Sequence, residues 1–244
     1  MPLCRGKQMR LPKLIALIAL VLAFTAGMAA HSAMVSRGFS LRNVFGRTDS
    51  TEKVRTAIVA RQTSAQYVAI RDFFAEFPGD AKIVVFGDSQ VAFADWSLLL
   101  DTGVANRGIY GETTAGALLR VDAIAAAHPK CVVTMLGIGD LAVGRSVESA
   151  AKDYAAILDR LAASGAKVLV QSVLPTEPPY SLNQKVTELN TKVRAACRGN
   201  CLFLDLDYIV TPGATIDGVH LKPTTYKKWA VKLKPAIAAH CAGP

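Results

Sequence analysis

From about residue 82 onward, short apolar runs rich in β-branched residues alternate with longer stretches whose apolar residues recur at helical spacing. Short runs of this composition between turn residues predict strands, and the periodic stretches predict helices. The predicted strands are Lys82–Phe86, Val104–Arg107, Val132–Leu136, Val168–Ser172 and Leu202–Leu206. The predicted helices are Phe93–Leu100, Thr114–Ala127, Val147–Ala163, Ser181–Ala196 and Thr224–Ala239.

The order of these elements predicts the fold class. Most of the predicted strands are continuously apolar, which is typical of parallel strands covered by helices on both faces. Five strand–helix units in series predict a three-layer α/β domain, with a doubly wound, five-stranded parallel sheet and right-handed crossovers. Ligands of such sheets bind beyond the carboxyl ends of the strands. The residues that directly follow each strand are therefore the candidates for function.

The first thirty residues have the pattern of a secretory signal. Four cations and no acid precede an apolar stretch from Leu14 to Phe24, and small residues follow as far as Ala30. An uncleaved signal anchor is the alternative, because no charge lies between Lys13 and Arg37, roughly the length of a spanning helix. A buried helix of a cytosolic protein is a third interpretation. The first two place the protein in the periplasm or outside the cell, the second with residues 14–36 as a membrane anchor.

A linker and then an amphipathic helix are expected between residues 31 and 80. Asp49 and Glu52 resemble a capping box, and apolar residues at helical spacing continue from Val54 to Phe77. Pro78 and Gly79 end this pattern. Residues 81–244 then form the predicted α/β domain.

Composition excludes two classes of protein. The chain is 51% apolar and 19% charged, which is too apolar for a disordered protein. Only one uncharged run is long enough to cross a bilayer, which excludes a protein with several spans. The formal net charge is +9, from 28 Lys+Arg and 19 Asp+Glu, and four of those cations lie in the first thirteen residues. Basic and aromatic residues do not interleave, so we expect no nucleic-acid partner.

Four cysteines of the predicted domain indicate disulfides in an exported chain. Cys131 and Cys201 open predicted strands, whereas Cys197 and Cys241 close helices, so all four are expected at the amino-end edge of the sheet. The expected pairs are Cys197 with Cys201 and Cys131 with Cys241. A zinc site is the alternative, but Cys-x-x-x-Cys without a companion Cys/His pair is a weak signal for one.

Four short motifs follow predicted strands or lie near the end of the domain. They are Gly87-Asp88-Ser89, the turn from Gly108 to Gly111, Gly137-x-x-Asp140 and Asp217-x-x-His220. Together they bring a hydroxyl, glycine-rich turns and an imidazole with a carboxylate to one edge of the sheet.

In their order and spacing these motifs resemble the blocks of the SGNH (GDSL-type) hydrolases, serine esterases and lipases with a flavodoxin-like sheet. The resemblance runs from about Lys82 to Ala239 and includes Asn190 and Asp205 as lesser landmarks. It implies ester hydrolysis without a metal or an organic cofactor.

The residue types fit that chemistry. His220 is the candidate base that activates the Ser89 hydroxyl, because imidazole titrates near neutral pH. Asp217 would orient the imidazole and stabilise its charged form. The backbone N–H groups of Ser89 and Gly111 would bind the oxyanion.

One position departs from the family pattern. The third block of the family normally carries an asparagine whose amide is a third oxyanion donor, and here that position is Gly139. Losing such a donor typically costs about 10²–10³ in rate. Gln90 and Asn106 are the nearest alternative amides in the motifs.

The main functional hypothesis is an exported or membrane-tethered serine esterase that forms an acyl-Ser89 intermediate. Its substrate would be a small-molecule, lipid or polysaccharide ester of the cell envelope or the extracellular space. One alternative is an O-acyltransferase that moves acetyl groups onto extracellular polysaccharide. Another is a non-catalytic envelope protein that retains the fold, which Gly139 favours.

Overall fold

A computed structural model describes residue 56 and residues 60–241 of the protein. The predicted signal or anchor and most of the predicted linker therefore lie outside the described residues. Within the described ranges, no helix combines the length and the apolar character that crossing a membrane requires.

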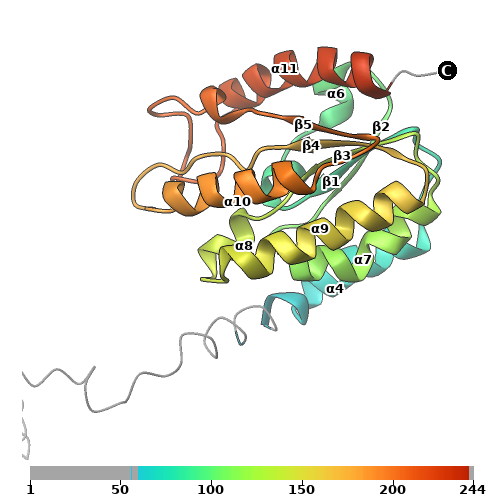
Figure 1. Ribbon diagram of the computed structural model, residues 1–244, viewed down its shortest axis with the longest axis horizontal. Coiled ribbons are helices and arrows are strands. Elements are labelled where there is room, and N and C mark those ends of the chain that lie inside the picture. Colours follow the sequence, from blue (N-terminus) through green and yellow to red (C-terminus); the bar gives the residue numbers. More distant parts are fainter. Residues whose placement is uncertain (1–55, 57–59, 242–244) are drawn as a thin grey trace, which may run out of the picture. The chain divides into compact units, whose positions relative to one another are not determined.

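A five-stranded parallel sheet forms the centre of the domain (Figure 1). In chain order its strands are β1 Ile83–Gly87, β2 Val104–Gly108, β3 Cys131–Met135, β4 Lys167–Gln171 and β5 Cys201–Leu204. Their spatial order is β2-β1-β3-β4-β5, which confirms the predicted doubly wound α/β fold. Strand β2 lies on one side of β1, and β3 lies on the other side of β1. The carboxyl ends of β1 and β3 thus flank the point where the winding reverses.

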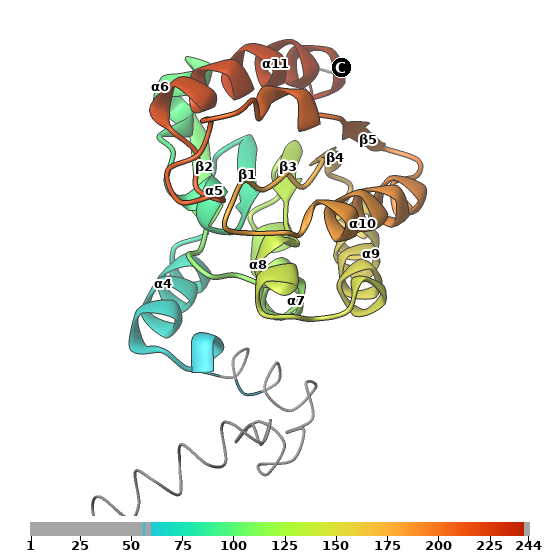
Figure 2. The same ribbon diagram turned by 90° about the vertical axis from the view of Figure 1, so that its left-hand side faces the viewer.

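Helices cover both faces of the sheet, and α6 and α11 lie opposite α7, α9 and α10 (Figures 1 and 2). From residue 65 onward the helices are α4 Ala65–Glu76, α5 Ser89–Ala92, α6 Trp96–Leu100, α7 Thr114–Ala126, α8 Ile138–Ala142, α9 Val147–Ala163, α10 Asn183–Ala196 and α11 Pro223–Cys241. A 3₁₀ turn, η1, spans Asp207–Ile209. The short elements α8 and η1 were not expected from the sequence.

The central strands β1, β3 and β4 are largely apolar because their residues supply both layers of the core. Val84 and Phe86 pack with the α7, α9 and α10 layer, whereas Val85 between them packs with α6 and α11. Val132 and Val133 divide in the same way on β3. This alternation buries both faces of these strands, so the accessible positions are the loops at the strand ends.

Two predicted helices differ from the structure. The helix expected over Phe93–Leu100 is interrupted, because Asp95 caps α6 by accepting a hydrogen bond from the Leu98 N–H at 3.0 Å. The helix expected up to Phe77 is also interrupted, because α4 begins only at Ala65. Its N-cap is Ser64, whose hydroxyl accepts from the Tyr67 N–H.

Both expected cysteine pairs form disulfides at the amino-end edge of the sheet. Cys131 at the start of β3 is joined to Cys241 at the end of α11, with a Cα–Cα distance of 5.5 Å. Cys197 after α10 is joined to Cys201 at the start of β5, with 5.2 Å between the Cα atoms. The first bridge connects positions 110 residues apart and the second positions only four apart.

We predict that the long-range disulfide stabilises the fold more than the short one. In the loop-entropy model, replacing Cys131 and Cys241 by serine lowers the free energy of unfolding by about 4–5 kcal/mol, against about 2 kcal/mol for Cys197 and Cys201. Urea unfolding of the two double variants under non-reducing conditions measures both values. Equal losses in the two variants would contradict the prediction.

Candidate active site

Ser89 and His220 meet at the carboxyl edge of the sheet, although they lie 131 positions apart in the chain. Ser89 opens α5 directly after β1, and His220 lies on the loop between η1 and α11. The Ser89 Oγ is 3.0 Å from the His220 Nε2, and the His220 Nδ1 is 2.6 Å from the Asp217 Oδ2. The three side chains thus form one hydrogen-bonded chain in the order that the sequence analysis expected.

The loop around Asp217 holds the imidazole in place. The Asp217 Oδ1 accepts the N–H groups of Val219 and His220 at 3.0 and 2.8 Å, while its Oδ2 faces the ring. Partial burial opposes ionisation, but these hydrogen bonds dominate and lower the pKa of Asp217 to about 2. The carboxylate therefore remains charged at any pH at which the imidazole is neutral. Gly218 has a φ of +95° and approaches the Glu177 carbonyl so closely that a Cβ would lie 2.6 Å from it.

Helix α5 positions the serine and also ties the histidine loop to it. Asp88 caps the helix by accepting the Gln90 N–H at 2.9 Å. The Gln90 side-chain amide donates to the Val219 carbonyl at 2.8 Å, so the residue after the serine binds the residue before the histidine. The Tyr226 hydroxyl in turn donates to the Gln90 carbonyl at 2.8 Å. The distance between Ser89 and His220 is thereby set by buried contacts.

A small pocket of about 100 Å³ lies beside these groups. Ser89 and Gly111, the two residues expected to offer backbone N–H groups to an oxyanion, line the pocket, and so does Gly139. Exposed aromatic rings flank the imidazole at its mouth. Phe93 and Tyr110 place their ring centroids 5.2 and 6.0 Å from that of His220.

Comparisons with known proteins agree with this geometry. Residues 85–228 match the GDSL-like lipase/acylhydrolase family. The chain belongs to this family.

Solved structures, among them GDSL-type proteins, share the fold at low sequence identity. A GDSL-like lipase from Bacteroides thetaiotaomicron is 24% identical with a TM-score of 0.58, over 76% of this chain and 97% of that one. A member of the lipolytic G-D-S-L family from Veillonella parvula is 19% identical with a TM-score of 0.58, over 65% and 98%. A carbohydrate esterase family 3 protein from Talaromyces cellulolyticus is 18% identical with a TM-score of 0.53, over 66% and 98%. Comparison with curated proteins finds no match.

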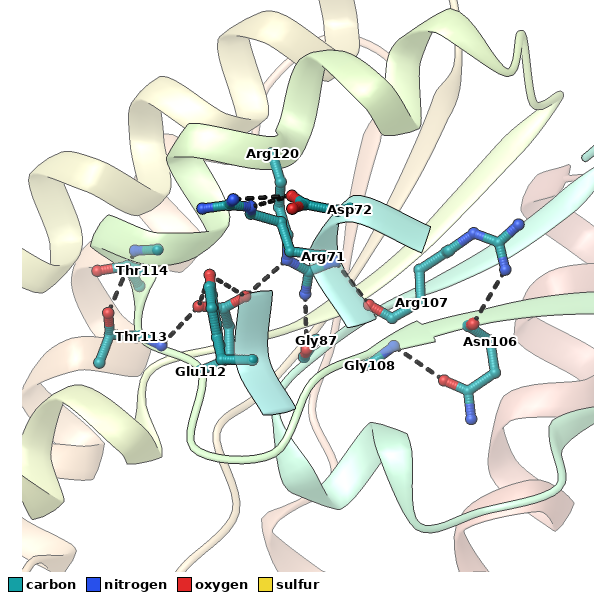
Figure 3. Close-up of polar contacts among 12 residues, drawn as sticks. Arg71, Asp72, Gly87, Asn106, Arg107, Gly108, Glu112, Thr113, Thr114 and Arg120 are labelled. Atoms are coloured by element: carbon teal, nitrogen blue, oxygen red, sulfur yellow. Dashed lines mark hydrogen bonds and ion pairs between the residues drawn. The ribbon is translucent and has the colours of Figure 1, made fainter. Parts of the chain in front are cut away.

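A buried ion pair supports the turn that carries Gly111, and sequence reasoning missed it. The Arg120 Nε donates to the Glu112 Oε2 at 2.6 Å, and both side chains are almost fully buried. The same guanidinium donates to the carbonyls of Gly87 and Arg107 at 3.1 and 2.8 Å (Figure 3). Arg120 thus joins the ends of β1 and β2 to the turn that carries Gly111. The glycine-rich block pointed to this turn, but nothing in it indicated the arginine on α7.

Packing accounts for the glycine in the third block of the family pattern. A Cβ at Gly139 would lie 2.0 Å from the Glu112 carbonyl oxygen. No side chain fits there unless the turn after Gly111 moves. The two alternative amides are also engaged elsewhere, because Gln90 donates to Val219 and Asn106 donates to the Val91 and Ala94 carbonyls.

The other landmarks of the family are structural in this chain. Asp140 on α8 accepts both the N–H and the hydroxyl of Thr114 at 2.8 Å and forms an ion pair with Arg145. Asn190 makes two hydrogen bonds with the backbone of Val173. The remaining landmark, Asp205, pairs with Arg194 at the surface. Within the part of the chain that the structure describes, no three His, Cys, Asp or Glu side chains are grouped as metal ligands.

We predict that Asp88 makes stability fall as the pH rises from about 5 to about 7. Burial, opposed by the hydrogen bond from Gln90, raises the pKa of Asp88 to about 7 from an ordinary value near 4. Between those values the folded protein holds a proton that the unfolded chain has lost, so ionisation favours unfolding. The expected loss in free energy of unfolding is on the order of 2 kcal/mol between pH 5 and 7.5. Urea unfolding at both pH values should show a smaller loss for Asp88→Asn. The same loss in both proteins would contradict the assignment.

We also predict that restoring the family asparagine at Gly139 impairs the site. The side chain would collide with the Glu112 carbonyl, which is backbone and cannot swing aside. Gly139→Asn should lower the free energy of unfolding by about 1–3 kcal/mol and leave esterase kcat no higher. Gly103→Asn is the matched control, because a Cβ there meets nothing within 4 Å. A tenfold rise in kcat for Gly139→Asn without loss of stability would contradict this prediction.

Proposed function

We propose that the protein is a serine esterase that hydrolyses carboxylic esters through an acyl-Ser89 intermediate. The observation that carries this proposal is the 3.0 Å contact between the Ser89 Oγ and the His220 Nε2, with Asp217 on the other ring nitrogen. A serine hydroxyl becomes an effective nucleophile only when a neighbouring base takes its proton. Membership of the GDSL-like lipase/acylhydrolase family supports ester hydrolysis as the reaction class.

In the first half of the proposed reaction, the His220 Nε2 accepts the Ser89 proton while Oγ bonds to the ester carbonyl carbon. The carbonyl oxygen becomes negative, and the backbone N–H groups of Ser89 and Gly111 stabilise it. When the bond to the alcohol oxygen breaks, His220 donates the same proton to that oxygen. The products of this half are the free alcohol and acyl-Ser89.

In the second half, His220 takes a proton from water as the water oxygen attacks the acyl carbon. The bond to the Ser89 Oγ then breaks, Oγ regains a proton from His220, and the carboxylic acid leaves. Asp217 stays ionised throughout, because its hydrogen bonds lower its pKa to about 2. It therefore stabilises the imidazolium that exists transiently in both halves.

The compartment forms a second part of the proposal. We infer that the enzyme is exported or membrane-tethered and acts on a small-molecule, lipid or polysaccharide ester of the cell envelope or the extracellular space. The signal-like pattern of residues 1–30 supports export. The two disulfides support an oxidising compartment, because such bonds are rare in the cytosol.

We predict that a fluorophosphonate probe labels the protein and that the label depends on Ser89 and His220. Ser89→Ala removes the nucleophile and should abolish labelling and the hydrolysis of p-nitrophenyl esters. His220→Ala should lower kcat about 10³-fold or more, because among residues 60–241 His220 is the base that contacts Oγ. Asp217→Asn should lower kcat by a smaller factor than His220→Ala does. The reason is that the Asp217 side chain is 49% exposed, so water can replace part of its hydrogen bonding.

Matched controls separate this chemistry from damage to the fold. Ser181→Ala and His128→Ala change exposed residues of the same types outside the hydrogen-bonded chain, and both should label like the unaltered protein. Equal labelling of Ser89→Ala, His220→Ala and these controls would overturn the assignment. Loss of labelling in all of them would do the same.

A further inference from the structure

A second, larger cavity adjoins the pocket beside Ser89. Its volume is about 280 Å³, and it lies between the N-terminal part of the described chain and the loop after β2. Three residues, Arg61, Tyr110 and Gly111, line both this cavity and the pocket of Ser89. The other walls are largely apolar and include Tyr67, Ile70 and Ile109. A substrate bound at Ser89 can therefore extend past Gly111 into this cavity.

Arg61 is the cation that lies where the two spaces join. Its Nη1 makes one long hydrogen bond, 3.4 Å, to the Gly111 carbonyl. Among residues 60–241, no carboxylate forms an ion pair with Arg61. Most of its five N–H donors remain available at the cavity, and a guanidinium with free donors binds carboxylates and phosphates strongly.

The acids that line the pocket together with Arg61 do not neutralise it. Asp88 and Glu112 are the two acidic residues that line the pocket of Ser89, and both are buried. Glu112 is paired with Arg120, and burial raises the pKa of Asp88 to about 7. The accessible charge at the junction of the two spaces is therefore positive. A neutral substrate makes no use of that charge, whereas an anionic one is attracted to it.

We propose that Arg61 and the 280 Å³ cavity form a subsite for an oxyanion group, carboxylate or phosphate, on the substrate of Ser89. The apolar walls take the carbon chain between the ester and the anionic group, and the guanidinium binds the anion. This inference rests on the proposed function in that the ester bond lies at Ser89. Arg61 precedes the matched region 85–228, so the cation of this subsite comes from outside the family domain, whereas Ile109, Tyr110 and Gly111 come from within it.

A binding experiment tests the subsite without relying on catalysis. The ligands are three 4-nitroanilides with chains of equal length, ending in a methyl group, a carboxylate or a phosphonate. Anilides replace the labile ester by an amide, so calorimetric titration of the full chain measures affinity directly. We expect the unaltered protein to bind at least one anionic anilide about tenfold or more tighter than the neutral one. The tighter of the two anionic ligands identifies the group.

Substitution of Arg61 locates the effect. Arg61→Gln should remove the preference for the anion while the affinity for the neutral anilide stays the same. Arg61→Lys should keep part of the preference, because it retains the charge without the planar fork. Arg71→Gln on α4 is the matched control, because Arg71 pairs with Asp72 and lines neither space. It should bind all three ligands like the unaltered protein.

The outcomes distinguish this inference from the proposed function. Equal affinities of the unaltered protein for all three anilides, absence of anion binding at millimolar concentration, or an unchanged preference in Arg61→Gln would each overturn the subsite. None of these results bears on whether Ser89 hydrolyses esters. Failure of the fluorophosphonate experiment together with a preference that depends on Arg61 would instead leave an anion-binding protein without esterase activity.

Discussion

The site depends on one buried ion pair, that of Arg120 with Glu112. Removing two charges from water is costly, and breaking such a pair typically costs about 3–5 kcal/mol because the remaining charge stays buried. Arg120 reduces this cost by using its other donors on the carbonyls of Gly87 and Arg107. Gly87 lies two residues before Ser89, and Glu112 follows Gly111. The ion pair therefore sets the distance between the two turns that face the proposed oxyanion.

The same constraint explains why the third family block has lost its side chain. The Glu112 carbonyl projects toward α8, and only a glycine at 139 allows the two segments to approach. The two turns nevertheless remain tightly packed, because Asp140 on α8 holds the first residue of α7 through Thr114. Position 139 therefore supplies no side-chain donor to the site. Its proposed oxyanion donors are therefore backbone N–H groups, whose positions depend on the loops and not on a rotamer.

Features with a local pattern were predictable from the sequence, and long-range contacts were not. Each strand lies within one or two residues of its prediction, and in β1, β3 and β4 the reason is that short apolar runs fill both core layers. The cysteine pairs followed from the ends of those elements. By contrast, apolar spacing alone did not show that α4 begins at Ala65, although Ser64 is a residue type that favours helix N-caps. Two contacts could not be predicted in this way, that of Arg120 with Glu112 and that of Gln90 with Val219. No local pattern shows that the residues of each pair meet in the folded protein.

The ion pair also connects the chemistry to the segment that precedes the family domain. The Tyr67 hydroxyl on α4 donates to the Glu112 Oε1 at 3.1 Å, so α4 is attached to the same buried carboxylate that supports Gly111. One turn earlier, the N–H and the hydroxyl of Ser64 both donate to the Arg61 carbonyl, which fixes the backbone of Arg61 relative to α4. Arg61 and Ser89 are thus positioned through one framework, although they come from different parts of the chain. Because the Arg61 side chain is exposed, its identity can change without disturbing the buried groups. In the proposed subsite, substrate preference can therefore change at Arg61 while the arrangement of Ser89, His220 and Asp217 is retained.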